Sequence, residues 1–463
     1  MKRISAWFVM TWMFAWVAQA ATPSVGDYPT VQAALDAHPG MRVFLPAGVW
    51  KLDQPVMLRT AGSGLYGPGT LQQSNPGAAV VRIDHADDVS LQDLIVERVH
   101  EENATEPSVL IDGARRATLS NVTVRNHRAR NAAIEVRSSE NVTIRGCLVH
   151  NYKCIAIDDR TASELYGYAF RAIDGTGILV QESTGTIIES NRVIEDRYLP
   201  TKAQHDQYGL GEVTVRPAER GRLMPQEAWE QNYVSNWHQG SAIVVTSPKA
   251  THHTIIRGNV LQHCAQGIDI HSDMVICADN IVDHGMMGVK MTHGSRNIIV
   301  KNNLLTHIDL WGILVNPGAA SSFAAAATGE TPAQPSNHDS GILISGNQIT
   351  DFGYGDEYWN WGGKHEDGGS SFPIAILEAQ LPEQNPRLSD ILIEGNLVYD
   401  AGRDASPAEA PRHRYAVYIA PKLDDPHAPV NVRVVNNIFH AGRSGVSNED
   451  LERLGFGPAA GVE

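Results

Sequence analysis

Short runs in which apolar residues alternate with polar ones recur along most of the chain, and each ends at a turn marked by Gly, Asn or Asp. This two-residue period is typical of β-strands, whose successive side chains point to opposite faces of a sheet. Asn259, Asn280 and Asn303 follow such runs at spacings of 21 and 23 residues. A fixed period of this length is typical of a solenoid, in which each repeat forms one coil.

The same repeat, an apolar run followed by a turn and an asparagine, continues toward both ends of the chain. It predicts an all-β fold, a single-stranded right-handed parallel β-helix. Further members lie at Asn347, Asn396 and Asn437, with earlier ones at Cys147 and Asn191. The larger gaps of 44, 49 and 41 residues fit either one coil with an insertion or two coils. An Asn at a tight turn tolerates a left-handed backbone and hydrogen-bonds its neighbours, so stacked coils predict a buried asparagine ladder. A β-sandwich would need regular hairpins, which the sequence does not show.

The first twenty residues are typical of an export signal. Lys2 and Arg3 precede an apolar stretch, and Ala18-Gln19-Ala20 fits a cleavage site, so we expect a secreted or periplasmic protein. No later apolar stretch is long enough to span a membrane. Residues 21–463 are predicted to form one domain, in which a short helix from Thr30 to Ala37 covers the N-terminal end of the solenoid.

The charge and composition of the chain limit the classes of molecule that it is expected to bind. The formal net charge is −15, and losing Lys2 and Arg3 with the signal takes it to −17, which disfavours nucleic acid as a partner. A polyanionic substrate would therefore need a local basic patch or a bound cation. Four cysteines are available for disulfides after export, but none lies in a paired metal-binding motif: Cys147, Cys154, Cys264 and Cys277.

The helical cap and the phrase "LYGPGTL" that follows it resemble the N-terminal part of the pectate-lyase-like superfamily of right-handed β-helix proteins. This resemblance implies a polysaccharide or oligosaccharide as the substrate, without fixing the reaction. We expect a monomer or a homotrimer.

A second set of apolar runs can be aligned coil by coil, including "AIVVTSP", "GIDIHSD", "GVKMTHG" and "GILVNPG". Their second and fourth residues are apolar and should face the core, so the third, fifth and sixth face outward. Adjacent coils lie about 4.8 Å apart, which brings equivalent outward residues together. The predicted catalytic cluster is Asp269, His271, Lys290 and His293. Arg296 and Asn316 are predicted to bind substrate beside it.

Long insertions should form the walls of this site. Residues 195–240, 352–372 and 402–415 are predicted to leave one border of the outward-facing sheet, and residues 318–338 the opposite border. They are rich in aromatic residues, whose rings stack against sugars. The remaining predicted substrate-binding residues lie on these loops or on the adjoining strands: Trp237, His238, Trp311, Trp359 and Glu378.

This set favours β-elimination from a uronic-acid polysaccharide, which needs a base, a proton donor and a group that neutralises the carboxylate. His271 or Lys290 would be the base, with Asp269 fixing the charge of its neighbour, while His293 and Arg296 would bind the carboxylate. The phrase "GVKMTHGSRN" resembles the Arg-His-Gly strand of β-helix alginate and chondroitin lyases at His293 and Gly294. In that resemblance Thr292 replaces the family's Arg, and His271 takes the place of its Lys base.

Two other functions stay open at this stage. A glycoside hydrolase or transglycosylase needs two carboxylates, offered by Asp158, Asp159 and Glu182 if "CIAIDDR" is a coil strand, or by Asp269 with Asp273. A non-catalytic glycan-binding β-helix is the third possibility.

No cofactor is expected, although Asp269 leaves calcium open. Nineteen histidines are scattered along the chain, and those such as His252, His253 and His263 fall on turns or on another sheet. They match no recognised ligand spacing, so no metal site is predicted.

Overall fold

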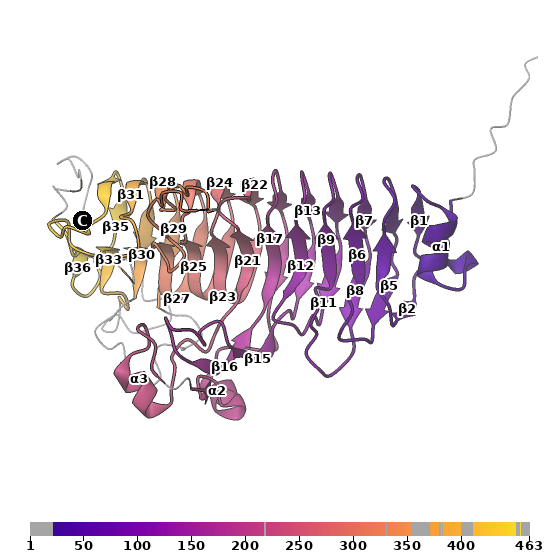
Figure 1. Cartoon of the computed structure of the whole chain (residues 1–463), viewed down its shortest axis with the longest axis horizontal. Helices are drawn as coiled ribbons and strands as arrows, with labels where there is room; N and C mark the ends of the chain where they lie inside the picture. Colours follow the sequence, from indigo (N-terminus) through magenta and orange to yellow (C-terminus); the bar gives the residue numbers. More distant parts are fainter. Residues whose placement is uncertain are drawn as a thin grey trace, which may run out of the picture.

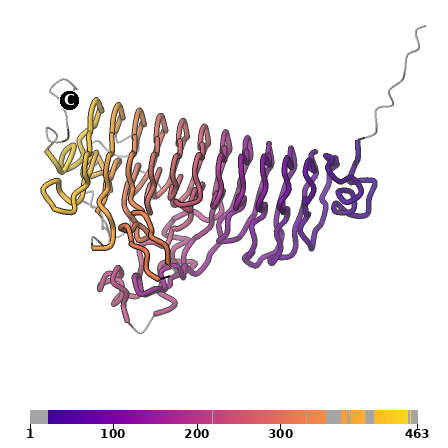
Figure 2. The backbone as a smooth tube through the Cα atoms, turned by 45° about the horizontal axis from the view of Figure 1, so that its top comes forward, coloured from indigo at the N-terminus to yellow at the C-terminus, as the bar shows by residue number. Residues whose placement is uncertain are grey.

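The chain winds into a long stack of coils (Figures 1 and 2). The computed structural model describes residues 22–216, 219–329, 331–353, 371–378, 381, 383–399, 411–450 and 454. Each coil contributes three strands, which pair in parallel with the equivalent strands of the next coil. The predicted right-handed parallel β-helix is confirmed.

The first strand of each coil belongs to a twelve-stranded sheet, called here the first sheet. Its strands are β1 (Arg42–Phe44), β4 (Gly64–Tyr66), β7 (Ser90–Gln92), β10 (Thr118–Ser120), β13 (Thr143–Arg145), β18 (Ile187–Glu189), β22 (His252–Arg257), β24 (Asp273–Ala278), β26 (Arg296–Lys301), β28 (Ser340–Ser345), β31 (Ser389–Glu394) and β34 (Val430–Val435).

The other two strands of each coil form a second and a third ladder, which share the long strands β23 (Val260–Ile270), β25 (Ile281–Met291) and β27 (Leu304–Val315). The second ladder also contains β2 (Val49–Leu52), β5 (Thr70–Gln73), β8 (Ile95–Arg98), β11 (Thr123–Arg125), β14 (Leu148–His150), β19 (Arg192–Ile194), β29 (Gln348–Thr350), β32 (Leu397–Tyr399) and β35 (Ile438–Phe439). The third also contains β3 (Val56–Leu58), β6 (Val81–Asp84), β9 (Val109–Asp112), β12 (Ala132–Arg137), β17 (Thr176–Gln181), β21 (Ser241–Thr246), β30 (Phe372–Ile376), β33 (Tyr415–Ile419) and β36 (Gly445–Ser447).

The asparagine ladder forms as predicted, and it runs through the interior. The side-chain Oδ1 of each ladder residue accepts a hydrogen bond from the backbone N–H of the equivalent residue one coil earlier, from Asn259 onto Asn280 at 3.0 Å and from Asn280 onto Asn303 at 3.0 Å. The left-handed backbone lies one residue earlier than expected, as at Asp279 with φ of 57°. The residue before the ladder asparagine therefore makes the turn, and the asparagine side chain forms hydrogen bonds with buried backbone groups.

We expect Asn280→Ala to lower the free energy of unfolding by about 2–3 kcal/mol, because it leaves the buried N–H of Asn259 and the carbonyl of Ile256 without partners. Chemical denaturation measures this loss. The matched control is Gln348→Ala, at an exposed strand position, which should change stability by less than about 0.5 kcal/mol. Equal effects of the two substitutions would contradict a structural role of the ladder.

The N-terminal cap also forms as predicted. A short 3₁₀ helix, η1 (Val25–Asp27), precedes α1 (Val31–Ala37), whose N-cap Thr30 accepts a hydrogen bond from the N–H of Ala33. Val31, Ala34 and Leu35 are buried in the main core. The helix thus covers the first coil, as Figure 1 shows at the end opposite the C-terminus.

A side unit grows from the border between the second and third ladders. The antiparallel strands β15 (Cys154–Asp158), β16 (Ala169–Asp174) and β20 (Val213–Val215) pack with the region of α2 (Lys202–Tyr208) and α3 (Gln226–Gln231), below the coils in Figure 1. Their apolar residues cover Met286, Met287 and Leu310 of β25 and β27. The expectation that "CIAIDDR" is a coil strand was wrong, since β12 pairs directly with β17.

The remaining insertions leave the coils at the expected places in the chain. Residues 318–338 lie between the third ladder and the first sheet, and Ser322 pairs there with Asn337 in an antiparallel bridge. The segment after β29 and the one after β32 precede strands of the third ladder. All four cysteines are buried thiols rather than disulfides. Among the described helices, none is long and apolar enough to cross a bilayer.

Candidate active site

The outer face of the third ladder carries the predicted cluster in the predicted register. Backbone pairing aligns one outward column across β21, β23, β25 and β27, made of Val244, Asp269, Lys290 and Leu314. Inward residues between them, such as Ile268 and Val289, are fully buried in the core. Asp269 and Lys290 are therefore neighbours on adjacent coils because strand alternation and coil length are both fixed by the core.

Asp269 is the centre of this cluster. One carboxylate oxygen lies 2.8 Å from Nε2 of His271, and Nζ of Lys290 lies 3.4 Å from the carboxylate. Only 6% of Asp269 is exposed. Burial raises its pKa, but the adjacent His271 and Lys290 outweigh burial, and the net pKa is well below the usual range. Asp269 is thus an ionised carboxylate that holds two basic side chains.

His271 and His293 face each other across adjacent coils. Their ring centroids lie 4.7 Å apart in an edge-to-face arrangement, and Nδ1 of His271 lies 3.3 Å from the Thr246 hydroxyl. Nδ1 of His293 accepts a hydrogen bond from the N–H of Ala320 at 3.0 Å, which leaves its proton on Nε2. Burial, with His271 and Lys290 nearby, lowers the pKa of His293 to about 3. His293 is therefore neutral near pH 7, so it would contact a substrate carboxylate as a hydrogen-bond donor through Nε2.

Hydrogen bonds with the 318–338 insertion and with Asp339, which follows it, hold the backbone at and after His293. The Asp339 carboxylate accepts hydrogen bonds from the N–H groups of Gly294 and Ser295, and the Asn337 side chain donates to the carbonyl of His293. Gly294 has a φ of 92°, and a Cβ there would lie 1.8 Å from the Asn337 side chain. Only glycine fits this position, which fixes where the His293 ring lies.

The structure brings some of the other predicted residues to this cluster and places others elsewhere. Asn316 lies beside it, since its side chain accepts a hydrogen bond from the Thr292 hydroxyl. Arg296 instead opens β26 in the first sheet and forms an ion pair with Asp273 at 3.2 Å. Arg296 was expected to point at the cluster because it closely follows His293, but the chain turns a corner between them.

The aromatic predictions were less accurate. Trp237 is 1% exposed and packs inside the side unit, and His238 is equally buried beside Lys153 at 2.7 Å, so neither is available to stack on a sugar. Trp311 is partly buried on the outer face of β27, in register with Met287. Glu378 lines a pocket beyond the end of β30. The strands β25 and β27 lie between β30 and β23, which carries Asp269. Trp359 lies outside the described residues.

The carboxylates considered for hydrolysis are committed to other contacts. Asp158 is buried in the side unit and paired with Arg160, Asp159 pairs with Arg130, and Glu182 accepts a hydrogen bond from Ser138. Asp273 pairs with Arg296 in the first sheet. Asp158 was expected on the outer face of a coil, but its strand belongs to the side unit, where the residue is buried. The alternation of a strand does not show which sheet the strand joins.

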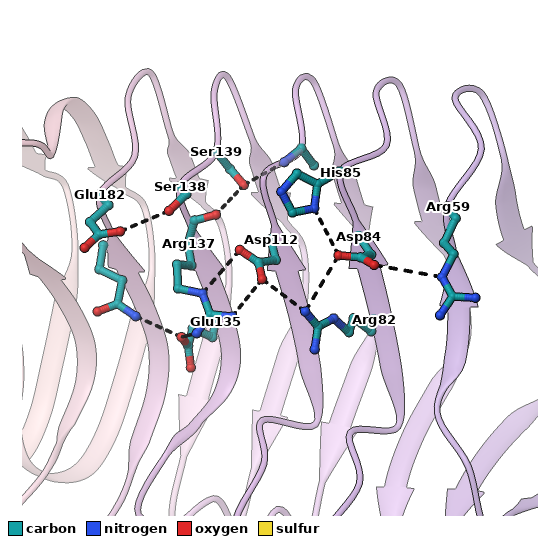
Figure 3. A network of polar contacts seen from close by, with 12 residues as sticks. Arg59, Arg82, Asp84, His85, Asp112, Glu135, Arg137, Ser138, Ser139 and Glu182 are labelled. Carbon is teal, nitrogen blue, oxygen red and sulfur yellow. Dashed lines mark hydrogen bonds and ion pairs between the residues drawn. The ribbon is translucent and has the colours of Figure 1, made fainter.

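The N-terminal half of the same face is also polar, but its charges neutralise one another. Figure 3 shows Arg82 and Arg137 converging on Asp112, at 3.2 and 2.7 Å, with Asp84 beside them. The Asp269 cluster differs, since one carboxylate there faces Lys290 and two histidines. Within the described part of this face, that cluster pairs one carboxylate with one lysine and places two histidine rings beside them.

Sequence reasoning missed a second cluster on β25 and β27. Oδ1 of Asp283 lies 2.7 Å from Nδ1 of His284 and 3.1 Å from Nδ1 of His307. A signal was present: His263, His284 and His307 each come four residues after a ladder asparagine. Short ligand spacings in the sequence do not reveal this cluster, because its residues repeat at the length of a coil.

Comparison with known proteins supports the fold. Residues 79–210 match the family model described as a right handed beta helix region. The chain is a right-handed β-helix protein. No curated protein sequence matches this β-helix protein significantly.

Solved structures share the β-helix at low sequence identity. The Dettilon tailspike protein is similar with a TM-score of 0.51 and 13% identity, over 90% of this chain and 63% of that one. The tailspike protein of E. coli bacteriophage HK620, solved with a pentasaccharide, has a TM-score of 0.50 and 14% identity, over 90% and 62%. An exopolygalacturonase from Thermotoga maritima has a TM-score of 0.48 and 12% identity, over 80% and 83%. This β-helix protein thus spans less than two thirds of either tailspike.

Proposed function

We propose that this β-helix protein is an exported polysaccharide lyase, which cleaves a uronic-acid-containing glycan by β-elimination at the Asp269 cluster (Asp269, His271, Lys290 and His293). The observation that carries the proposal is one buried, ionised carboxylate that orients a histidine and a lysine on an outward-facing sheet. The pentasaccharide bound by the HK620 tailspike supports a glycan as the ligand of this fold.

The electrostatics favour elimination over hydrolysis. A glycosidase needs one carboxylic acid that donates a proton and a second carboxylate as base or nucleophile. The low pKa of Asp269 makes it a poor proton donor, and Asp273 belongs to the first sheet and pairs with Arg296. Elimination instead needs a base and a positive charge at the substrate carboxylate, which His271 and Lys290 supply.

The proposed roles follow from the hydrogen bonds. Asp269 accepts a hydrogen bond from Nε2–H of His271, so Nδ1 carries no proton and is the proposed base; Nδ1 accepts a hydrogen bond from the Thr246 hydroxyl at 3.3 Å. Nδ1 takes the proton from the carbon next to the substrate carboxylate, while Lys290 neutralises the charge that develops on that carboxylate. The carbon's electron pair forms the new double bond, the glycosidic C–O bond breaks, and the leaving oxygen takes a proton from the His271 imidazolium. The Nε2–H of His293 is placed to donate a hydrogen bond during this step.

A substrate panel tests the reaction class. The full chain would be incubated with uronic and neutral polysaccharides, while new reducing ends and the absorbance of the unsaturated product at about 235 nm are both recorded. We expect both signals to rise together on a uronic polymer. Reducing ends without the absorbance would contradict elimination and support a hydrolase. Binding without either signal would support a glycan-binding β-helix.

Lys290→Met is expected to lower kcat/KM on that polymer by about 10²-fold, because it removes the charge that stabilises the developing anion. Lys290→Arg should recover part of the loss, since the charge is restored in a different shape. Steady-state kinetics with both variants measures this. Equal losses in the two variants would argue against a role of positive charge at this position.

A further inference from the structure

A second group of side chains that suits a ligand lies at the border between the second and third ladders. Asp283 and His284 are on β25, and His307 is on β27 of the next coil. One donor atom from each lies within 4.8 Å of the others. All three side chains are partly exposed, at 25%, 30% and 17%, so a small ion can reach them. We call these three residues the Asp283 cluster.

The distances suit shared coordination of one ion. Protein nitrogen and oxygen donors lie about 2.0–2.2 Å from Zn²⁺, which places neighbouring donors of a tetrahedral site roughly 3.3–3.5 Å apart. The two distances from Asp283 Oδ1 to the Nδ1 atoms, 2.7 and 3.1 Å, are close to this separation. A small outward movement of the three side chains would thus admit an ion between them.

The two histidines are held in place by the coils. His284 and His307 occupy the same position in successive coils, each with a left-handed backbone, at φ of 57° and 53°. The equivalent His263 of the preceding coil has the same conformation, at φ of 54°, so the repeating turn of the coils fixes this backbone geometry. The rings of His284 and His307 stack with centroids 4.4 Å apart and only 13° between the planes. Both Nδ1 atoms lie beside the same carboxylate oxygen, Oδ1 of Asp283. This arrangement requires little ordering on binding.

Asp283 is held on both sides of its carboxylate. Its Oδ1 atom lies beside Nδ1 of His284 and Nδ1 of His307. Gln262, on the preceding coil, donates a hydrogen bond to the other carboxylate oxygen at 3.2 Å. Such outer hydrogen bonds orient metal ligands and tune their affinity.

We propose that the Asp283 cluster binds one divalent transition-metal ion of the Zn²⁺ class. Two imidazoles and one carboxylate match the preference of Zn²⁺, Co²⁺ and Ni²⁺, whereas Ca²⁺ and Mg²⁺ prefer sets made of oxygen alone. The ion would join β25 to β27 near the point where the side unit leaves the coils. This site is separate from the Asp269 cluster, and its occupancy does not depend on the proposed lyase activity.

Metal titration of the full chain tests the site. Zn²⁺ would be titrated against a chromophoric chelator, and Co²⁺ would be followed through its visible absorption spectrum. We expect one ion per chain and a Co²⁺ spectrum typical of mixed nitrogen and oxygen ligands. His307→Asn and His284→Asn should each weaken Zn²⁺ binding more than about 100-fold, and Gln262→Ala should weaken it roughly 10-fold. Asparagine is chosen because it tolerates the left-handed backbone, so the turn is kept.

The matched control is His253→Asn, which also keeps a left-handed backbone, at φ of 59°. The Nδ1 atoms of His252 and His253 lie 2.7 Å apart, so these two residues also form a histidine pair. The Asp283 carboxylate is not part of that pair. We expect the control to bind Zn²⁺ as the unchanged chain does. The proposal is overturned if the unchanged chain takes up no ion at micromolar Zn²⁺ or Co²⁺, or if His307→Asn binds as tightly while keeping its circular dichroism spectrum. Loss of binding in His253→Asn alone would place the ion at the other pair and would also overturn it.

Discussion

His271→Ala is expected to lower kcat on a uronic polysaccharide by about 10²–10⁴-fold, with a much smaller change in KM. The imidazole is the proposed base and proton carrier, and general acid–base catalysis contributes rate enhancements of this size. Its removal leaves Lys290 and the sheet in place, so substrate binding should persist. Steady-state kinetics, supported by a binding measurement with an unreactive oligosaccharide, separates the two effects.

His253→Asn serves as the control, because His253 lies on the first sheet and is exposed, and asparagine keeps its left-handed backbone. It should leave kcat and KM unchanged. If His271→Ala weakens binding in proportion to turnover, the cluster holds the glycan without transforming it, and the proposed elimination at this site is wrong.

Asp269→Asn is expected to lower the free energy of unfolding by about 3–5 kcal/mol at pH 7, because it leaves the Lys290 ammonium without its buried counter-charge. Activity should fall as well, since the asparagine amide no longer fixes which nitrogen of His271 carries the proton. Denaturant titration of both proteins measures the stability difference.

The pH dependence of that difference follows from the lowered pKa of Asp269. A carboxyl whose pKa is lower in the folded than in the unfolded chain contributes stability that is fully present above the unfolded pKa of about 4 and is lost as pH falls through the folded pKa. The gap between the unchanged chain and Asp269→Asn should therefore stay constant above about pH 5 and narrow below pH 4. A gap that widens on acidification would mean that the Asp269 carboxylate is not ionised in the folded protein.

The sequence predicted the coils and the Asp269 cluster because both depend on a strict period. Alternation of inward and outward residues fixes the face of each side chain, and a constant coil length fixes its neighbours. Asp269 and Lys290 therefore had to meet once the strands were aligned. The asparagine ladder followed from the same repeat, although its left-handed residue lies one position earlier than expected.

The errors share a physical cause, which is packing between segments that no period relates. Trp237 and His238 look like exposed loop residues, but the side unit buries them among strands from two separate insertions. Asp158 sits on a strand whose alternation resembles that of a coil strand, yet it pairs in the side sheet. Arg296 is close to His293 in sequence, but the corner between the third ladder and the first sheet separates their directions.

The asparagine ladder gives the solenoid a modular architecture along its axis. Each coil carries its own connector, since a ladder asparagine receives the N–H of the coil before it and presents its own N–H to the next. Stability in such an array is close to a sum over coils and their shared interfaces. Pulled from its ends, the protein should extend in steps of about one coil rather than in a single cooperative event. Natural or engineered variants should gain or lose whole coils while the remaining sheet surface keeps its geometry.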